Sequence, residues 1–464
     1  MSRQMLKSPW ALPAARSDDT AERPGRAPRA ALKPPRGAKA HRFVFAVPPS
    51  RCRDLQVFVD LQSAKRRVAT TADAAHEAAV RAAPDRPPQP RLAVSEGSIA
   101  CVLRARNARV RAEFTRTLIR TGTARKTLYR LTLELLSGSP GDLSSLAARL
   151  AERFDLWQDP RPVRAIAQAV ARGADSLPPV LATSVVLDRH MNAAAALGRM
   201  VGNCLEQILP NLAEVAAGTA TAEHVHQARV GVRRLRAMLR EFGAWSPGVD
   251  PAWEPTLAAL FRRLGAQRDR DVLMETLLPA IRAAGGPPIR LAVADPGTGS
   301  AMHAARDRAA VAVLIALTAF SWTHADEASE VAMHEVDDLR DMAGAALKRL
   351  HARIRRDASR FAELNDEDRH DLRKRLKRLR YCVELAAGVC PEAAVKHFLA
   401  ALRPVQSAIG EYTDLLLAES ALAASAEQDP GAGFALGWLA ARRPILLAST
   451  ARALKRFAAV KWPC

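Results

Sequence analysis

Two stretches of the chain place the same pattern of basic residues behind a histidine, about 144 positions apart. At roughly 100° per residue, offsets 0, +3, +7 and +10 from each histidine fall within about 80° of one another on a helix. One face of each predicted helix therefore carries a strip of cations, and arginines in such a strip suit the binding of phosphate or carboxylate groups. The repeated residues are His226, Arg229, Arg233, Arg234 and Arg236 in the first stretch and His370, Arg373, Lys377, Arg378 and Arg380 in the second.

Apolar residues occupy the opposite side of both predicted helices. In the first stretch they are Val232, Leu235 and Leu239, and in the second they include Leu372 and Leu379. Their spacing is typical of a helix that buries one face. Each helix is thus predicted to present its cations to an anionic partner.

A second landmark follows each stretch at a matching distance. LGAQRD contains Gly265 and Asp269, and IGEYTD contains Gly410 and Asp414. Each aspartate lies about 43 or 44 positions after its histidine. Two landmarks at matching offsets indicate an internally repeated helical domain.

The two histidines allow two interpretations, and both remain open. An imidazole in the strip can donate a hydrogen bond to phosphate, more strongly when it is protonated. Alternatively, each histidine caps a helix or bridges the two halves and orients the next arginine. Neither has a second ligand at helical spacing, since His224 lies only two positions before His226, so no metal site is predicted. No catalytic role is predicted for either, because no nucleophile or acid recurs beside both.

The composition separates the chain into two parts. The formal net charge is +21 over 464 residues. Residues 1–185 hold 32 basic and 16 acidic side chains, whereas residues 186–464 hold 37 and 32. Six cysteines lack metal-ligand spacing and predict buried thiols rather than a disulfide framework. The longest apolar run, 309–320, is too short to span a bilayer, so a cytoplasmic protein without a membrane partner is expected.

The pattern along the chain predicts a mainly α protein with an α+β domain or a small barrel ahead of its helices. Residues 1–40 are expected to be a disordered basic tail. Strands are predicted at RFVFAV, LQVFVDL, SIACVL and LYRLTLELL, followed by a helix at about 143–154. The predicted domains are 41–177, a linker at 178–189, and a helical domain at 190–462.

The helical domain is predicted to form two four-helix halves, each with one histidine helix. Pro404 is expected to kink or split the helix that contains it. The predicted helices are 187–209, 222–243, 254–284, 301–322, 328–357, 366–387, 391–425 and 432–458.

The repeated H-x-x-R-x-x-x-[KR]-R-L-R pattern, with LG-x-x-x-D or a close variant behind it, resembles the CHAD domain over roughly 186–462. The resemblance implies a pseudo-twofold pair of four-helix bundles whose basic face binds inorganic polyphosphate, and an association with polyphosphate granules. The resemblance also implies contacts from further residues of the same two helices. The full implied set is His226, Arg229, Arg233, Arg234, Arg236, Arg240, His370, Arg373, Lys374, Lys377, Arg378 and Arg380.

The N-terminal part resembles a CYTH domain, a triphosphate tunnel barrel, with important departures. HRFVFAVPPSRCRDL is similar to its opening strand and helix, and LTLELLSGSPGDLSSLAARLAERF to a later pair. The alternating acids of that family correspond here to Arg130, Thr132, Glu134 and Leu136, so one carboxylate remains. Such enzymes hold a divalent metal through several carboxylates. We therefore expect a degenerate barrel without phosphohydrolase activity and without a cofactor, which either still binds phosphate chains or has drifted.

The ligand expected for the helical domain is a plain phosphate polymer. Single-strand nucleic-acid sites interleave aromatic residues with the bases, and the basic faces contain almost none, Tyr381 being the nearest. Three alternatives stay open: a surviving metal-dependent triphosphatase, a nucleic-acid-binding protein, and a general storage-granule scaffold.

Overall fold

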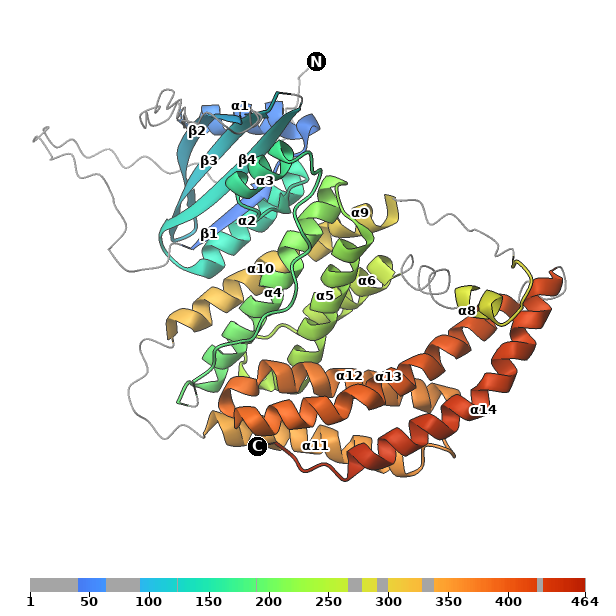
Figure 1. Cartoon of the computed structure of the whole chain (residues 1–464). Helices are drawn as coiled ribbons and strands as arrows, with labels where there is room; N and C mark the ends of the chain where they lie inside the picture. The colour runs from blue at the N-terminus through green and yellow to red at the C-terminus, as the bar shows by residue number, and fades with distance from the viewer. Residues whose placement is uncertain are drawn as a thin grey trace, which may run out of the picture. The chain divides into compact units, whose positions relative to one another are not determined.

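The computed structural model describes residues 41–63, 92–122, 124–188, 190–265, 278–289, 299–327, 338–423 and 429–463. The predicted tail at 1–40 and Asp269 lie outside these residues. The described part contains an antiparallel sheet followed by two groups of helices (Figure 1). The predicted combination of an α+β part with a mainly helical part is therefore confirmed.

The sheet has five strands in the order β2-β3-β4-β1-β5, with antiparallel pairing throughout. Within the described residues β2 and β5 are the outer strands of the sheet. The long strands β2, β3 and β4 are consecutive in the chain and pair as a meander. The strands are β1 (Arg42–Ala46), β2 (Ala93–Ala105), β3 (Ala108–Arg120), β4 (Arg125–Ser137) and β5 (Trp157–Gln158).

In this region one prediction was wrong and one strand was not predicted. LQVFVDL forms part of helix α1 (Cys52–Ser63) and not a strand. Its buried residues Leu55, Phe58 and Val59 recur at helical spacing, and the run of apolar letters concealed that period. Strand β3 was missed because charged residues such as Arg111 alternate with its buried positions.

Helices cover both faces of the sheet (Figure 1). Helix α1 and helix α2 (Pro140–Phe154) pack on the face that carries Phe43, Phe45 and Leu133. The predicted helix at 143–154 is thus confirmed. Helix α3 (Val163–Ala171) lies against the other face, where Ile166 and Val170 enclose Ile119.

The remaining helices form two bundles. The first bundle contains α4 (Ala193–Ala217), α5 (Ala222–Phe242), α6 (Trp253–Gly265) and α10 (Arg308–Glu327). The second contains α11 (Leu339–Ser359), α12 (Asp366–Leu385), α13 (Glu392–Ala423) and α14 (Pro430–Ala458). In the described part of the stretch between α6 and α10 lie two short helices, α8 (Leu278–Ala283) and α9 (Gly299–Ala305). The predicted pair of four-helix groups is confirmed.

Several predicted helix bounds agree with the structure, and others do not. Helix α4 ends at Ala217 and not at 209, while residues 266–277 of the predicted helix 254–284 and residues 328–337 of the predicted helix 328–357 lie outside the described residues. Helix α4 begins at Ala193, after an extended segment, and not at 187. The predicted helix at 301–322 is divided into α9 and α10, and Asp307 caps the second through Ala310 N at 3.0 Å. Pro404 lies inside one helix, α13, and does not split it.

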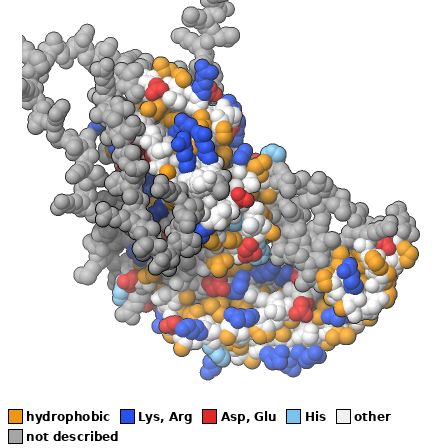
Figure 2. Space-filling model, turned by 45° about the horizontal axis from the view of Figure 1, so that its top comes forward, with side chains coloured by type: hydrophobic (Ala, Val, Ile, Leu, Met, Phe, Trp, Pro, Cys, Tyr) orange, Lys and Arg blue, Asp and Glu red, His pale blue; other side chains and the backbone are white. Residues whose placement is uncertain are grey.

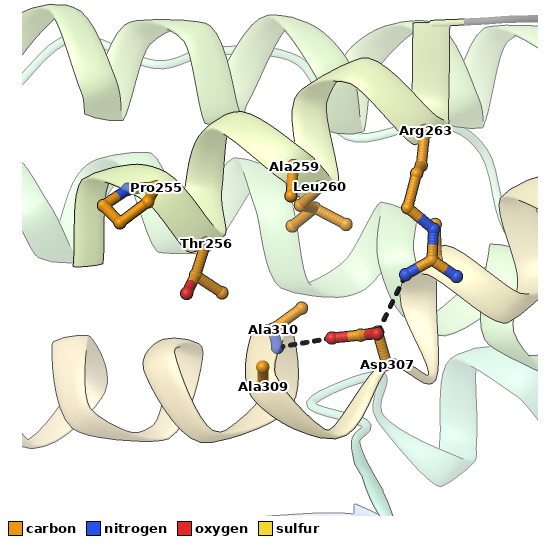
Figure 3. Close-up of a pocket in the computed structure, with 9 residues that line it drawn as sticks. Pro255, Thr256, Ala259, Leu260, Arg263, Asp307, Ala309 and Ala310 are labelled. Atoms are coloured by element: carbon orange, nitrogen blue, oxygen red, sulfur yellow. Dashed lines mark hydrogen bonds and ion pairs between the residues drawn. The ribbon is translucent and has the colours of Figure 1, made fainter. Parts of the chain in front are cut away.

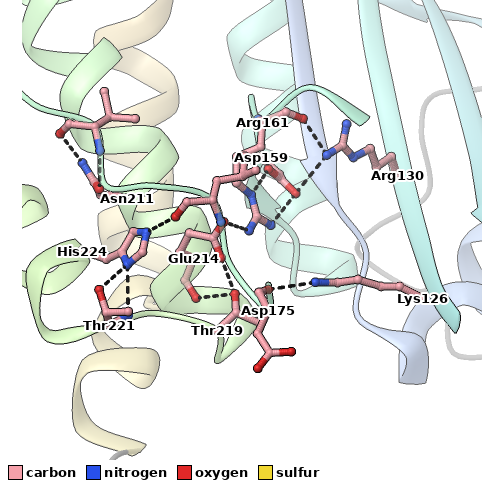
Figure 4. Close-up of polar contacts among 12 residues, drawn as sticks. Lys126, Arg130, Asp159, Arg161, Asp175, Asn211, Glu214, Thr219, Thr221 and His224 are labelled. Atoms are coloured by element: carbon pink, nitrogen blue, oxygen red, sulfur yellow. Dashed lines mark hydrogen bonds and ion pairs between the residues drawn. The ribbon is translucent and has the colours of Figure 1, made fainter. Parts of the chain in front are cut away.

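A buried ion network joins the sheet domain to the first bundle (Figure 4). Asp159, directly after β5, receives two hydrogen bonds from Arg161, at 2.7 and 2.8 Å. Arg161 also contacts Glu214 of α4 at 2.9 Å, and Arg130 of β4 lies 3.4 Å from Asp159. Burial opposes ionisation of Asp159, but the hydrogen bonds and charges of Arg161 and the charge of Arg130 lower the carboxyl pKa below its usual value. The two parts are thus joined by paired charges that are shielded from water.

The segment between α3 and α4 lies extended along α4, and we call residues 176–188 the strap. It bonds to polar side chains of α4 at three points, two through its backbone and one through a side-chain hydroxyl. Leu177 N donates to Glu214 at 3.0 Å, Val180 N and O bond to Asn211 at 3.1 and 2.8 Å, and Thr183 accepts from Asn203 at 2.8 Å. The predicted linker is therefore held along a helix.

Four cysteines, Cys52, Cys101, Cys204 and Cys382, carry free thiols. Burial raises the pKa of Cys204 to about 11, so its thiol is unreactive at neutral pH. Cys390 is disulfide-bonded, and the prediction of an unpaired thiol is wrong at that position. Within the described ranges, no helix is long and apolar enough to cross a membrane.

Candidate polyanion-binding site

The two histidine helices pack against each other where the bundles meet. Arg233 Nε of α5 donates a hydrogen bond to Tyr381 Oη of α12 at 2.9 Å. Cys382 Sγ of α12 lies 3.6 Å from the carbonyl oxygen of Ala237 in α5. The basic strips predicted 144 positions apart in the chain therefore meet along one helix pair.

Four cations gather around this contact, and we call Arg233, Arg373, Lys377 and Arg380 the cation cluster. Burial, followed by the charges of Arg233 and Arg373, lowers the pKa of Lys377 to about 7. The charge of Arg380 acts in the same direction and that of Asp414 opposes it. Among the described residues, Lys377 has no hydrogen-bond or ion-pair partner. Like charges held this close favour an anion between them.

Aromatic rings line part of the cluster. Tyr381 is buried, and the guanidinium carbons of Arg233 and Arg380 lie 5.5 and 4.6 Å from its ring centroid. On the outer side of α5, Arg229 and Arg236 lie 4.8 and 5.7 Å from the ring of Phe261. These cation–π contacts hold the planar guanidinium groups in place and leave their positive charge unneutralised.

Carboxylates neutralise several of the predicted contact residues. Arg236 pairs with Glu254 at 2.6 Å, Arg373 with Asp414 at 3.0 Å and Arg378 with Glu241 at 2.9 Å. Lys374 pairs with Asp371 at 2.9 Å, and Arg380 lies 3.8 Å from Glu384. The strips are therefore less positive than the spacing alone predicts, and among the described residues no carboxylate forms an ion pair with Arg233 or Lys377.

Arg234 requires a correction, because the structure does not place it on the exposed face. Its side chain is 2% exposed. The guanidinium donates to Gln207 at 2.9 Å and to Asn203 at 3.2 Å, both on α4. Arg234 at offset +8 faces the bundle interior, about 100° from its neighbour at +7.

Lys377 also differs from its prediction. The spacing predicted a solvent-facing side chain at both Arg233 and Lys377, but each is half-buried. Arg240 and Lys374, in contrast, are exposed on their helices. The strips are thus partly buried where α5 and α12 pack at Arg233 and Lys377, and they are exposed to solvent at Arg240 and Lys374.

The histidines at the head of the strips are half-buried. Burial, together with the charges of Lys374 and Arg373, lowers the pKa of His370 below its ordinary value. The charge of Lys377 contributes in the same direction, which places His370 beside the cation cluster. His226 occupies the corresponding turn of α5.

His224, set aside by the sequence argument, has a structural role. Its Nδ1 accepts a hydrogen bond from Thr221 N at 3.0 Å at the start of α5, and its Nε2 donates to Leu177 O at 2.8 Å (Figure 4). The side chain caps α5 and holds the strap. A capping signal was present in the sequence, because Thr221 precedes His224 by three positions.

The glycine landmarks occupy equivalent places in the two bundles. A Cβ at Gly265 would lie 2.6 Å from Arg229 Nη2, and a Cβ at Gly410 would lie 3.9 Å from Arg373 Nη2. Each glycine therefore faces the arginine at offset +3 of its own histidine helix. This correspondence supports the structural repeat that the spacing predicted.

The sheet face that would line the expected barrel carries both positive and negative side chains. Arg42 and Arg111 stand on either side of Glu134 in adjacent strands, where cross-strand pairs of opposite charge are favourable. Arg130 is buried and engaged with Asp159 and the carbonyl oxygen of Arg161. Of the other two positions, Thr132 is half-buried and Leu136 exposed. In the described part of the chain, no group of three or more His, Cys, Asp or Glu side chains is placed to hold a metal.

A pocket of about 250 Å³ lies between α6 and α10 (Figure 3). It is lined mainly by small or apolar side chains such as Pro255, Ala259 and Leu260. Its charged groups, Arg263 and Asp307, pair at 2.8 Å. None of the cation-cluster residues lines this pocket, so it does not extend the candidate site.

Residues 199–423 match the family model of the CHAD domain. This part of the chain is a CHAD domain. A search of curated proteins finds no match. Among solved structures, the chain is similar to the crystal structure of the CHAD domain from the plant Ricinus communis, with 29% identity and a TM-score of 0.48, over 62% of this chain and 99% of that one. The cation cluster and both histidine helices lie inside the matched CHAD range.

Proposed function

We propose that the protein binds inorganic polyphosphate at the cation cluster and associates with polyphosphate granules. The observation that carries the proposal is the meeting of Arg233 and Lys377 from two separate helices, with no carboxylate hydrogen-bonded or ion-paired to either among the described residues. The CHAD family is associated with polyphosphate binding. A phosphate chain lying over the contact between the helices would relieve the mutual repulsion of Arg233 and Lys377.

The chemistry of the cluster favours a phosphate polymer over a nucleic acid. Arginine forks bind phosphoryl oxygens in a bidentate manner and remain charged. The nearby ring, Tyr381, is 1% exposed, so it offers no surface on which a base could stack. The ligand that fits is a chain of phosphates without bases.

A binding assay tests the proposal. Arg233→Glu combined with Lys377→Glu is expected to reduce affinity for long-chain polyphosphate at least tenfold at low salt, because it removes both cations of the centre and adds two anions. The matched control is Arg116→Glu with Arg120→Glu, two exposed arginines of β3. Equal affinity of the two variants would exclude the cluster as the site, and stronger binding of DNA than of polyphosphate by the unaltered protein would favour a nucleic-acid role.

We also propose that the N-terminal domain is a degenerate CYTH-like domain without triphosphatase activity. Its support is the arrangement of Arg42, Glu134, Arg111 and Arg130, in which cations occupy the sheet face and the carboxylate lies between two of them. The test is magnesium-dependent phosphate release from triphosphate and from polyphosphate. Release that is abolished by Glu134→Gln would establish the alternative, a metal-dependent phosphohydrolase.

A further inference from the structure

A second basic surface lies on α11, which the repeated motif does not include. Four arginines, Arg349, Arg353, Arg356 and Arg360, fall within roughly 60° of the helix circumference and span about 16 Å of its axis. They are exposed, as are Lys348 and Arg355 in the same part of the helix. We call this set, Lys348, Arg349, Arg353, Arg355, Arg356 and Arg360, the outer face of α11.

The charges of this face are little neutralised. Arg360 lies 3.8 Å from Glu363, and both side chains are largely in water. Among the described residues, the guanidinium groups of Arg349, Arg353 and Arg356 have no hydrogen-bond or ion-pair partner. Asp357 of the same helix pairs with Arg375 of α12 and not with these arginines. The outer face of α11 thus retains more unpaired positive charge than either histidine helix.

The corresponding helix of the first bundle lacks this surface. Helices α4 and α11 each precede a histidine helix and pack on it. Within α4 the exposed charged side chains are Arg199 and Glu206, and the strap and α10 lie against the helix. The basic face is therefore a specific property of the second bundle and does not follow from the repeat.

We propose that the outer face of α11 is a second binding surface for a linear phosphate polymer, separate from the cation cluster. The identity of the polymer rests on the proposed function. A single row of arginines one helix wide fits a thin chain of phosphates, which the guanidinium groups can grip without any shape-specific pocket. Figure 2 shows Lys and Arg side chains gathered in patches over the helical part of the molecule.

Other partners fit this face less well. Apart from the cations, its exposed side chains are Asp341, Ala345, Ala352 and Ser359. It therefore offers no ring for a base and no large apolar side chain to enter a lipid surface. The apolar residues of α11, such as Leu347 and Ile354, are buried in the bundle.

The test compares five full-length proteins by their affinity for long-chain polyphosphate over a range of salt concentrations. They are the unaltered protein, the cluster variant R233E with K377E, an α11 variant with R349E, R353E and R356E, the combination of these two variants, and a control with R116E, R120E and R125E. The control changes the charge by the same amount on exposed positions of the sheet. Far-UV circular dichroism and thermal unfolding check each fold, and a Gln version of the α11 variant replaces the Glu version if that one is unstable.

The α11 variant is expected to lose at least tenfold in affinity at low salt and to show a salt slope about two units smaller, while the control changes less than threefold. Combining the α11 and cluster changes is expected to give additive losses, because the surfaces are separate. If the α11 variant binds like the control, this inference is wrong and the proposed function stands. If the cluster variant binds like the control but the α11 variant does not, the proposed site fails and the α11 surface stands. Tighter binding of an RNA or an anionic vesicle than of polyphosphate through the α11 arginines would overturn the choice of polymer.

Discussion

Lys377 links polyanion binding to pH. Its pKa of about 7 means that the free site is largely neutral at this position in mild alkali. A bound anion favours the charged ammonium, so binding above pH 7 requires proton uptake. The surrounding groups are Arg233, Arg373, Arg380, Asp414 and His370, and the lowered pKa of His370 places its own titration at more acidic pH.

We therefore expect affinity for polyphosphate to fall about tenfold between pH 6.5 and 8.5 at constant salt. Lys377→Arg is expected to make affinity nearly independent of pH over this range, because arginine stays charged. Calorimetry in two buffers of different ionisation enthalpy measures the proton uptake directly. An unaltered protein that takes up no proton at pH 8 would contradict this assignment.

Substitutions of the neighbouring residues Arg233 and Arg234 are expected to affect different properties: polyphosphate affinity for Arg233 and stability for Arg234. Arg234→Met leaves the buried amides of Asn203 and Gln207 without their donor and is expected to lower the free energy of unfolding by about 2 kcal/mol. Polyphosphate affinity of the folded protein is expected to stay within twofold. Arg233→Met is expected to reduce affinity several-fold with stability changed by less than about 1 kcal/mol. Urea unfolding and a binding titration on both variants separate the two roles, and equal losses of affinity would refute them.

At the residue scale, helical periodicity predicted the apolar faces correctly. Leu235 and Leu379 are fully buried, as expected. Periodicity did not predict which cations keep their charge, because the neutralising carboxylates Glu254 and Asp414 come from other helices. Their positions depend on tertiary packing, which the local pattern does not contain.

The two landmark glycines give a prediction at the scale of the helix. Gly410 lies inside α13 with ordinary van der Waals space around a Cβ, so Gly410→Ala is expected to stabilise the protein by about 1 kcal/mol. Gly265→Ala places its Cβ 2.6 Å from Arg229 Nη2 and must displace that guanidinium from Phe261. It is expected to give no stabilisation. Thermal unfolding of both variants measures the difference, and an equal gain in both would show that Arg229 moves freely.

Elements with strong helical periodicity, such as α5 and α12, were predicted within a few residues. Elements whose sequences do not show a clear helical period were not predicted correctly. Helix α1 was mistaken for a strand because apolar β-branched and aromatic residues fill its buried face. The predicted start of α4 was too early because the strap is bonded to a helix rather than being part of one.

The ion network between sheet and bundle gives a prediction for the whole molecule. Arg161→Met removes the cation that pairs with both Asp159 and Glu214, leaving two buried carboxylates. We expect a loss of about 3–5 kcal/mol in the free energy of unfolding. Arg164→Met, on the exposed side of α3, is the matched control and is expected to change stability by less than about 0.5 kcal/mol.

A second substitution tests the cause of that loss. Arg161→Met combined with Glu214→Gln is expected to recover part of the stability, since one of the unpaired charges is removed. Urea unfolding followed by circular dichroism measures all four proteins. A double variant as unstable as the single one would show that Glu214 does not share the pair.

At the scale of the whole molecule, the repeated spacing predicted two helical groups and their shared motif. It did not predict which residues of the two histidine helices contact each other, such as Arg233 and Tyr381 across 148 positions. Nor did it predict α11, whose arginines belong to no repeated motif. Both features arise from packing between halves that are distant in sequence.

The strap has a practical consequence for dissecting the chain into fragments. Asn203, Asn211 and Glu214 bond to the backbone or side chains of Leu177, Val180 and Thr183. A fragment that begins at 190 would expose these groups along α4, ready to bond an extended segment of another molecule. Fragments that begin before 176 keep that row occupied, so they are the ones in which monomeric behaviour is expected.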